Sequence, residues 1–332
     1  MKTCTGMSPL PSETHSLAPR TVSVIIPARN EAHFIASVIQ AVQAQATRDL
    51  ALDILVVDDG SSDGTPAVAR AAGARVVELE SSEQGGNPAR ARNRGAAESV
   101  GDPLIFLDAD CTPEPSWLAG LLAAHDAGAA VVGGALDLPR HLPITARCDY
   151  YCGWYHVHSA RRRGAVPNHP PGNLSVRRAV FADSSGFTEQ QPVAYAHEEL
   201  AWQGEVLRSG GKIVFEPHAI VRHRNRPGFG NLLRRNYRWG YSAIESKASS
   251  GAARAAWLYR YPAFLVASSI PLAMASAGYI VGCWLRAGVL EPILMLPAVL
   301  AARLAYSAGL VAGGLRWLRH GTLAPATRPR WE

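Results

Sequence analysis

The sequence predicts an α/β protein with a mostly parallel sheet, followed by C-terminal membrane helices. In the first part of the chain, short apolar runs alternate with segments of helical periodicity. Strands separated by helices imply crossover connections and therefore parallel strands. Toward the C-terminus, Tyr261–Leu285 runs about 25 residues without a charge, which is long enough to cross ~30 Å of hydrocarbon as a helix.

The first part of the chain is expected to fold as a series of strand–helix units. The apolar runs that predict strands are Val22–Ile26, Asp53–Val57, Arg75–Leu79, Leu104–Leu107 and Ala130–Val132. The segments expected to form helices between them are Glu31–Ala46, Thr65–Ala72, Pro88–Val100 and Trp117–Ala127. Ligands of such sheets bind at the carboxyl ends of the strands, so chemistry is expected there.

A second apolar stretch, Pro292–Leu315, is interrupted by Arg303 near its middle. A central arginine costs ~2.5–3.5 kcal/mol on insertion scales. We therefore expect this segment either to span the membrane with Arg303 facing the first helix or a headgroup, or to lie re-entrant in the interface. Basic residues flank the two apolar segments, and only Arg286 and Glu291 carry charge between them. By the positive-inside rule, both ends of the resulting hairpin are cytosolic.

These observations divide the chain into five parts. No apolar signal segment precedes the first strand, so the soluble part is expected to stay in the cytosol, beside the plasma or inner membrane. The expected parts are a disordered leader (1–20), a catalytic domain (21–225), basic aromatic interfacial helices (226–260), a transmembrane or membrane-embedded hairpin (261–318) and a basic cytosolic tail (319–332).

Composition excludes several classes of protein. Of 332 residues, 48% are hydrophobic and 18% are charged, which is too apolar for a disordered chain. Five cysteines without a CxxC pair fit neither a disulfide scaffold nor a zinc site. The formal charge of +6 indicates an anionic partner, such as a nucleotide, a nucleic acid or a membrane surface.

Acidic residues follow two of the expected strands. Asp58 and Asp59 end the second strand, and Asp108 and Asp110 follow the fourth. Carboxylates crowded at strand ends repel one another and need a cation or a hydrogen-bond donor. Mg²⁺ and Mn²⁺ prefer such oxygen ligands. The alternative is that acids here form turns and helix caps, which suits Asp63 well and extends to Asp59.

Several segments, in order, resemble a family 2 glycosyltransferase of the GT-A fold. The first is Val-Ile-Ile-Pro-Ala-Arg-Asn-Glu at 24–31, followed by Val-Asp-Asp-Gly-Ser-Ser-Asp-Gly-Thr at 57–65 and Asp-Ala-Asp at 108–110. Further matches are Ala-Arg-Asn-Arg-Gly at 91–95, Gly-Asn-Leu-Ser-Val-Arg-Arg at 172–178 and His-Glu-Glu at 197–199. The resemblance covers about residues 21 to 240, and it implies a GT-A (nucleotide-diphospho-sugar transferase) Rossmann-like sheet.

The resemblance implies a nucleotide-diphosphate sugar donor and a divalent metal, Mg²⁺ or Mn²⁺. The metal would stabilise charge on the leaving diphosphate in an inverting transfer. Asp110 is implied as a metal ligand, Asp108 as a contact through water or the donor ribose, and His223 as a further metal or phosphate contact. The implied donor-binding residues are Pro27, Ala28, Glu31, Asp58, Asp59 and Arg92, of which Asp58 would accept from the base and Arg92 would meet the diphosphate. For Arg92, a solvated helix face is the alternative.

The family usually places Glu-Asp where this chain has Glu198-Glu199, so Glu199 aligns with the general base. Helix capping is the alternative for this pair. The implied acceptor-side residues are Asn173, Arg235, Arg238 and Trp239, the last three from an element similar to the (Q/R)xxRW of lipid-modifying relatives. Basic and aromatic residues around this element suit an interfacial helix. The apolar hairpin that follows favours lipid over nucleic acid as the partner.

The function expected from these residues is transfer of a sugar to a lipid-linked or amphiphilic acceptor at the cytosolic membrane face. A lipid or glycolipid acceptor is favoured because the hairpin holds the site near the interface. The alternatives are a non-catalytic nucleotide-sugar-binding membrane scaffold and a sugar-phosphate nucleotidyltransferase.

Overall fold

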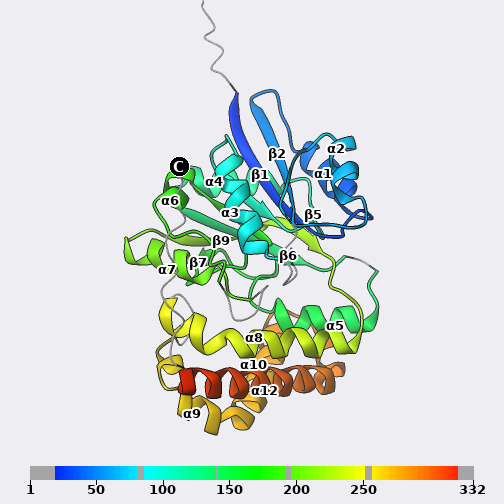
Figure 1. The fold of residues 1–332 in the computed structure, drawn as a ribbon. Coiled ribbons are helices and arrows are strands. Elements are labelled where there is room, and N and C mark those ends of the chain that lie inside the picture. Colours follow the sequence, from blue (N-terminus) through cyan, green and yellow to red (C-terminus); the bar gives the residue numbers. More distant parts are fainter. Residues whose placement is uncertain (1–18, 81–85, 140, 191–195, 251–255, 321–332) are drawn as a thin grey trace, which may run out of the picture.

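The chain folds into a sheet domain and a layer of C-terminal helices beneath it (Figure 1). The computed structural model describes residues 19–80, 86–139, 141–190, 196–250 and 256–320. The expected α/β class with a mostly parallel mixed sheet is confirmed. The expected leader and basic tail lie almost wholly outside the described residues.

The strands form one sheet in the order β3-β2-β1-β4-β8-β6-β9-β5, with β7 paired to β9. Strands β3, β2, β1 and β4 are parallel, whereas β8 runs antiparallel to both β4 and β6. The parallel arrangement brings the carboxyl ends of β1, β2 and β4 to one edge of the sheet. The strands are β1 Arg20–Ala28, β2 Leu50–Asp58, β3 Arg75–Glu78, β4 Leu104–Leu107, β5 Cys111–Pro113, β6 Val131–Asp137, β7 Gly164–Ala165, β8 Asn173–Val176 and β9 Ile213–His223.

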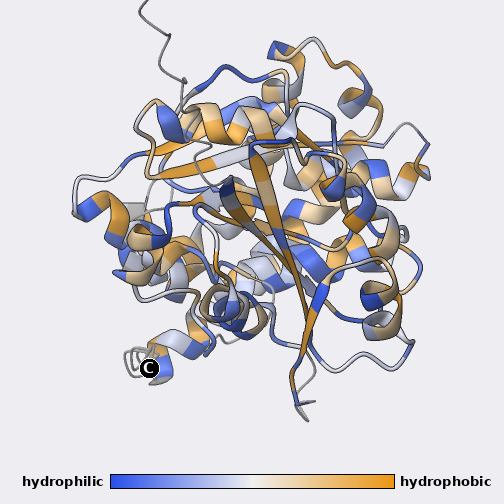
Figure 2. Cartoon of the chain, turned by 90° about the horizontal axis from the view of Figure 1, so that it is seen from above, coloured by the Kyte–Doolittle hydropathy of each residue, from blue (hydrophilic) through white to orange (hydrophobic). Residues whose placement is uncertain are grey.

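Helices cover both faces of the sheet, so the central strands are apolar on both sides. In β1, Val24 and Ile26 join one core cluster and Ile25 joins another, which explains a continuous apolar run instead of alternation. Figure 2 shows the hydrophobic colour along these strands between the flanking helices. The helices of this domain are α1 Ile35–Gln43, α2 Thr65–Ala71, α3 Pro88–Glu98, α4 Trp117–Asp126, α6 Arg178–Ala182 and α7 Leu200–Arg208. Helix α5, Ile144–Gly153, lies beside the C-terminal helices, and its buried residues share a core cluster with them (Figure 1).

The C-terminal layer differs from the expected pair of long helices. Its elements are α8 Phe229–Ser250, the 3₁₀ helix η1 Ala256–Arg260, α9 Pro262–Ala267, α10 Ser269–Arg286, α11 Glu291–Leu294 and α12 Leu296–His320. The apolar segment Tyr261–Leu285 does not form one continuous helix, because it is divided at Ser268. Pro271 lacks the N–H that would bond the Ala267 carbonyl, so the helical ladder is interrupted there. Among the described residues, only Leu296–Arg319 is long and apolar enough to cross a membrane.

Arg303 in the middle of α12 faces the preceding apolar helix, which was one of its two expected orientations. Its Nε donates to Ser276 Oγ of α10 at 2.9 Å. Its guanidinium also lies over the Tyr306 ring, 4.1 Å from the centroid. The charge is thus directed toward protein groups instead of the outer surface of the layer.

Glycines allow α8 and α12 to pack backbone against backbone. A Cβ added at Gly309 would overlap the Tyr237 carbonyl oxygen, and one at Gly313 would overlap that of Tyr241. Gly240 of α8 makes the reciprocal approach to α12. Side chains larger than hydrogen at these three positions would force the helices apart.

We expect Gly309→Ala to destabilise the helical layer by about 1–3 kcal/mol, the usual cost of overpacking. The thermal midpoint of the detergent-solubilised protein measures the effect. Gly282→Ala in α10 is the matched control, because a Cβ there meets nothing within 4 Å. The control should be neutral or slightly stabilising, since alanine is the better helix former. Equal midpoints for the two variants would contradict close packing of α8 on α12.

Candidate active site

The carboxylates that end β2 are buried and organise the loops around them. Asp58 accepts hydrogen bonds from the Ser61 backbone N–H, at 3.0 Å, and from the Ser61 hydroxyl. Asp59 accepts from the backbone N–H of Asn87, the N-cap residue of α3. The Asp59 side chain therefore has a structural role in holding the start of α3, in line with the alternative of a turn or cap residue. Asp58 stays a prediction for the nucleobase contact.

The loop after β1 brings Glu31 toward the acids of β4. Pro27 is partly exposed and Ala28 is buried at the end of β1. The Glu31 backbone N–H donates to Thr65 Oγ1 at 2.9 Å, and α1 begins at Ile35, later than the expected Glu31. Burial and the neighbouring charge of Asp110 raise the pKa of Glu31, and Arg226, 3.2 Å away, opposes the rise. Glu31, expected to bind the nucleoside, therefore lies near Asp110, expected to bind the metal.

A cluster that could hold a metal ion lies where β5 pairs with β9. One ligand atom each of Asp110, Cys111 and His223 lies within 4.8 Å of the others. The His223 Nε2 is 3.7 Å from Asp110 Oδ1. Its Nδ1 is 2.9 Å from Asn225 Oδ1. Because an amide oxygen only accepts, Nδ1 carries the proton of this hydrogen bond, and Nε2 faces Asp110.

Asp110 gives this cluster a carboxylate oxygen, the kind of ligand that Mg²⁺ and Mn²⁺ prefer. Burial raises the pKa of Asp110, His223 opposes this and Asp108 adds to it, so a bound cation would stabilise the carboxylate. Burial and Asp110 raise the pKa of the Cys111 thiol well above its usual value. Sequence reasoning missed Cys111, because only the β5–β9 pairing places it there.

Arg92 bridges the metal side and the expected base side. It is buried, so the alternative of a solvated helix face is wrong. Its Nη2 donates to Asp108 Oδ1 at 2.6 Å and its Nη1 to Glu198 Oε1 at 2.8 Å. Burial alone would lower the pKa of Arg92, but the two carboxylates outweigh burial and raise it. Both terminal nitrogens are therefore engaged, and a contact with diphosphate would require one of them to exchange partners.

Glu199 is a second buried acid of this site, and its surroundings raise its pKa. It stands at the N-cap of α7, but its side chain makes no capping hydrogen bond. Burial, then the charge of Glu198, raises the pKa of Glu199 to about 8. His197 before the pair adopts a left-handed φ of 64° and bonds Ser242 of α8 at 2.9 Å. The segment is thus fixed in a conformation uncommon for a residue other than glycine.

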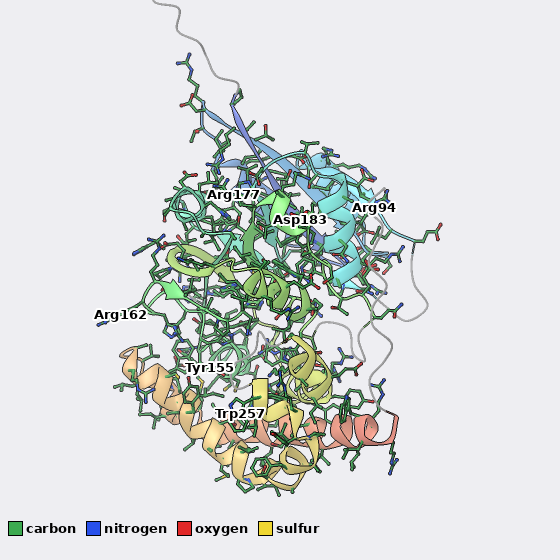
Figure 3. All side chains as sticks on the ribbon, turned by 90° about the vertical axis from the view of Figure 1, so that its left-hand side faces the viewer. Arg94, Tyr155, Arg162, Arg177, Asp183 and Trp257 are labelled. Carbon is green, nitrogen blue, oxygen red and sulfur yellow. The ribbon has the colours of Figure 1, made fainter. Side chains whose placement is uncertain are left out.

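A cavity of about 390 Å³ connects these residues with the helical layer. Arg92, Asp108, Glu198 and Glu199 line it from the sheet domain. Residues 154–156 also line it, and Figure 3 shows Tyr155 at the boundary between the two layers. Farther along this loop, Arg163 pairs with Glu216 at 2.9 Å, and Arg162 points outward at the molecular edge.

Two of the predicted acceptor-side residues do not reach the cavity. Asn173 is fully buried, where its Oδ1 accepts from Trp117 Nε1 at 2.8 Å and its Nδ2 donates to the Ala135 and Ala219 carbonyls, both at 2.9 Å. This amide joins strands of the sheet, so its prediction is corrected. Arg238 is exposed on α8 and is not among the cavity-lining residues.

Arg235 supports the metal side, and Trp239 lines the cavity. The Arg235 Nη2 pairs with Asp149 Oδ1 at 2.6 Å. Asp149 accepts from Asn225 Nδ2 at 2.7 Å, and Asn225 in turn orients His223. Arg235 therefore acts through two residues, and the predicted acceptor contact is corrected. The Trp239 ring lies under the Arg235 guanidinium, with 4.6 Å between the ring centroid and Arg235 Cζ, and it borders the cavity.

These features define a GT-A glycosyltransferase, with acids at the carboxyl ends of parallel strands and a buried acid in the adjoining cavity. A sequence model described as glycosyl transferase family 2 matches residues 23–181. Glycosyltransferase AglE of Haloferax volcanii is 33% identical over 230 residues, which cover 68% of this chain and 73% of the relative. The chain belongs to glycosyl transferase family 2 and is an enzyme of that family.

Two further relatives show how far the similarity extends. The pre-mycofactocin glycosyltransferase of Mycobacterium tuberculosis is 27% identical over 234 residues, which cover 68% of this chain but 47% of the relative. The structure of mannosyltransferase PcManGT from Pyrobaculum calidifontis, in complex with GDP-Man and Mn²⁺, has a TM-score of 0.58 and 20% identity. It covers 91% of this chain and 88% of its own, so the shared fold extends beyond the sheet domain.

Proposed function

We propose that the protein is an inverting glycosyltransferase that moves a sugar from a nucleotide-diphosphate sugar to a lipid-linked or amphiphilic acceptor at the cytosolic membrane face. One observation carries the proposal. A single cavity holds Glu199 and Asp108 and continues into the C-terminal helical layer. Donor chemistry, a base and an amphiphile can therefore meet in one enclosed space.

The donor side uses the residues around Asp110. Asp110 and His223 would hold Mg²⁺ or Mn²⁺, which supplies charge stabilisation for the leaving diphosphate when it is bound. The GDP-Man and Mn²⁺ bound by PcManGT support this assignment. Asp108 lies beside the cluster, and its position depends on Gly172, where a Cβ would be 2.7 Å from Asp108 Oδ2. Pro27, Ala28, Glu31 and Asp58 form the nucleoside side at the ends of β1 and β2.

The base is Glu199. As the acceptor oxygen bonds to the anomeric carbon, the sugar–diphosphate bond breaks, and Glu199 takes the hydroxyl proton. One direct displacement of this kind inverts the anomeric configuration. Glu198 pairs with Arg92 and so leaves Glu199 as the acid without an ion-pair partner among the described residues. The raised pKa of about 8 brings Glu199 near the operating pH, as an efficient base requires.

The membrane partner is supported by the distribution of exposed apolar side chains. Only Phe34, Val100 and Ile144 are large and exposed in the described part of residues 20–225. The helical layer exposes Trp257, Tyr261, Phe264, Ile270, Met274, Tyr279, Leu285, Leu290, Ile293, Leu294, Leu296, Leu304, Leu315 and Leu318. Concentration of such residues on one layer is typical of a surface that meets protein or lipid.

The packing of α8 favours helices that lie in the membrane interface over helices that cross it. α8 runs along α12 through Gly309 and Gly313, and it carries the exposed Arg234 and Arg238. A helix with these charges does not enter hydrocarbon, whereas arginine suits the headgroup region. If α12 crossed the bilayer, α8 would be carried into the hydrocarbon with it. We therefore place the whole layer in the cytosolic interface.

We expect the double variant Phe264→Glu, Leu294→Glu to lose vesicle binding. Burying a large apolar side chain contributes about 1.5–3 kcal/mol, so losing two weakens partitioning by more than about 100-fold. Flotation with phosphatidylglycerol–phosphatidylcholine vesicles measures the effect. The control is Val100→Glu, which alters an exposed apolar residue of the sheet domain. If the double variant floats like the wild type, the membrane assignment fails.

A thermal-shift screen tests the donor assignment. UDP- or GDP-sugars should raise the melting temperature in the presence of Mn²⁺ or Mg²⁺ and should lose most of the effect in a chelator, because ligand bound only by the native state stabilises it. If no nucleotide or nucleotide sugar shifts the melting temperature with either metal, the proposed donor is wrong.

A further inference from the structure

The end of the cavity that lies in the helical layer carries two cations. Lys247 from α8 and Arg303 from α12 line it, together with Tyr259 of η1 and Tyr306 of α12. The Lys247 Nζ donates to the Tyr306 hydroxyl at 3.1 Å and lies 5.1 Å from the centroid of the Tyr259 ring. The two tyrosine hydroxyls are 3.4 Å apart. Four side chains from three helices thus converge on one wall.

Neither cation has a carboxylate partner in the described part of the chain. Of the other charged groups that line the cavity, Arg92 is paired with Asp108 and Glu198, whereas Glu199 forms no ion pair with another described residue. Among the described residues, the Lys247 Nζ donates a hydrogen bond only to the Tyr306 hydroxyl, and the Arg303 Nη atoms donate none. Partly desolvated cations without a counter-charge are unfavourable, and an anionic ligand would compensate them.

We propose that Lys247 and Arg303, with the hydroxyl of Tyr259, form a subsite for a phosphate group of the acceptor. The subsite deepens the proposed function and rests on it. Two cations match the charge of a phosphate monoester or diphosphate, about −1.5 to −2 for the monoester at pH 7, better than a single carboxylate. Guanidinium and ammonium groups are the usual partners of such oxygens.

The position of the subsite assigns it to the acceptor and not to the donor. Donor chemistry belongs to Asp108 and Asp110, which the sheet domain supplies. Lys247 and Arg303 come from the helical layer, whose outer surface exposes apolar side chains such as Phe264 and Leu294. A phosphate held there would sit at headgroup depth, with its lipid chain outside and its sugar-accepting end toward Glu199.

The test is binding of farnesyl phosphate to the detergent-solubilised full chain, in EDTA so that no metal-bound anion competes. We expect Lys247→Met and Arg303→Met each to weaken binding by about tenfold, the size of one charge-assisted hydrogen bond. Arg286→Met, which removes an exposed cation of α10, should bind like the wild type. Farnesol should bind all four proteins equally weakly. Unchanged affinity for farnesyl phosphate in both cavity variants would overturn the subsite.

Two further measurements separate the outcomes. Inorganic phosphate should displace farnesyl phosphate if the subsite recognises the phosphate itself, and failure to compete, with farnesol binding as tightly, would show that only the lipid chain is bound. The Mn²⁺-dependent melting shift with UDP- or GDP-sugars should be retained in both cavity variants. That retention shows an intact fold and donor site. Loss of the shift in the wild type would count against the proposed function, whereas loss of phosphate binding counts against the subsite alone.

Discussion

An Asp110→Asn enzyme should lose about 10²–10⁴-fold in kcat, because a metal at a leaving diphosphate supplies several kcal/mol and each 1.36 kcal/mol is tenfold in rate. The substitution keeps the shape of the side chain but removes the charge that faces His223 Nε2. Mn²⁺ titration followed by nucleotide-sugar binding measures the cause directly. The concentration of Mn²⁺ required for half-maximal donor binding should rise together with the loss in kcat.

Asp183→Asn is the matched control for this variant. Asp183 is exposed on the sheet domain, and Figure 3 shows it far from the helical layer. Its loss should leave both the Mn²⁺ requirement and the rate unchanged. If Asp110→Asn retained wild-type activity and an unchanged Mn²⁺ requirement, the metal would lie elsewhere and the role of the cluster at β5 and β9 would be wrong.

Glu199→Gln should lower kcat by about 10²–10⁴-fold, the usual contribution of a general base, while donor binding is retained. The variant keeps the hydrogen-bonding shape but cannot accept the acceptor proton. The pH profile of the wild type gives a second readout. Because the base must be deprotonated, kcat/KM should rise with pH and level off above the Glu199 pKa of about 8.

The pH dependence of thermal stability tests the raised pKa of Glu199 without measuring turnover. Its folded-state pKa of about 8 lies above the ordinary value of a glutamate side chain, 4.5, so the native state binds the extra proton. The native state is therefore penalised increasingly as pH rises from about 4.5 toward 8. Glu199→Gln should melt above the wild type at pH 9, and the difference should vanish near pH 4.5. A difference that does not vary with pH would contradict an unpaired, buried Glu199.

The sheet domain was predictable because its signals are local. The run at Leu104–Leu107 forms β4 with the expected bounds, and Thr65 begins α2 as expected. The strand-end acids were found because parallel strands place their carboxyl ends together. The uncharged run Tyr261–Leu285 predicted one helix, but the structure has two, α9 and α10, divided near Pro271. The length of an uncharged run does not show where the backbone hydrogen bonds of a helix are interrupted.

The site was harder to predict because its pairings are long-range. Arg92 was assigned to diphosphate, but Asp108 and Glu198 occupy its terminal nitrogens, and Glu198 is 106 positions away. Asn173 lies in a segment that resembles the family's acceptor-side motif, but its amide hydrogen-bonds to backbone carbonyls of neighbouring strands. No sequence pattern shows that Lys247 and Arg303 share one wall, since that depends on how α8 packs on α12.

The central claim is metal-assisted sugar transfer to a lipid, and one measurement tests it most directly. The full chain in phosphatidylglycerol–phosphatidylcholine vesicles that contain extracted membrane lipids is incubated with Mn²⁺ and UDP- and GDP-sugars labelled in the sugar. We expect label to enter the lipid fraction as an equal amount of nucleoside diphosphate is released, with neither product formed by Asp110→Asn or Glu199→Gln. Pyrophosphate in place of nucleoside diphosphate, or equal labelling by the two variants, would contradict the account.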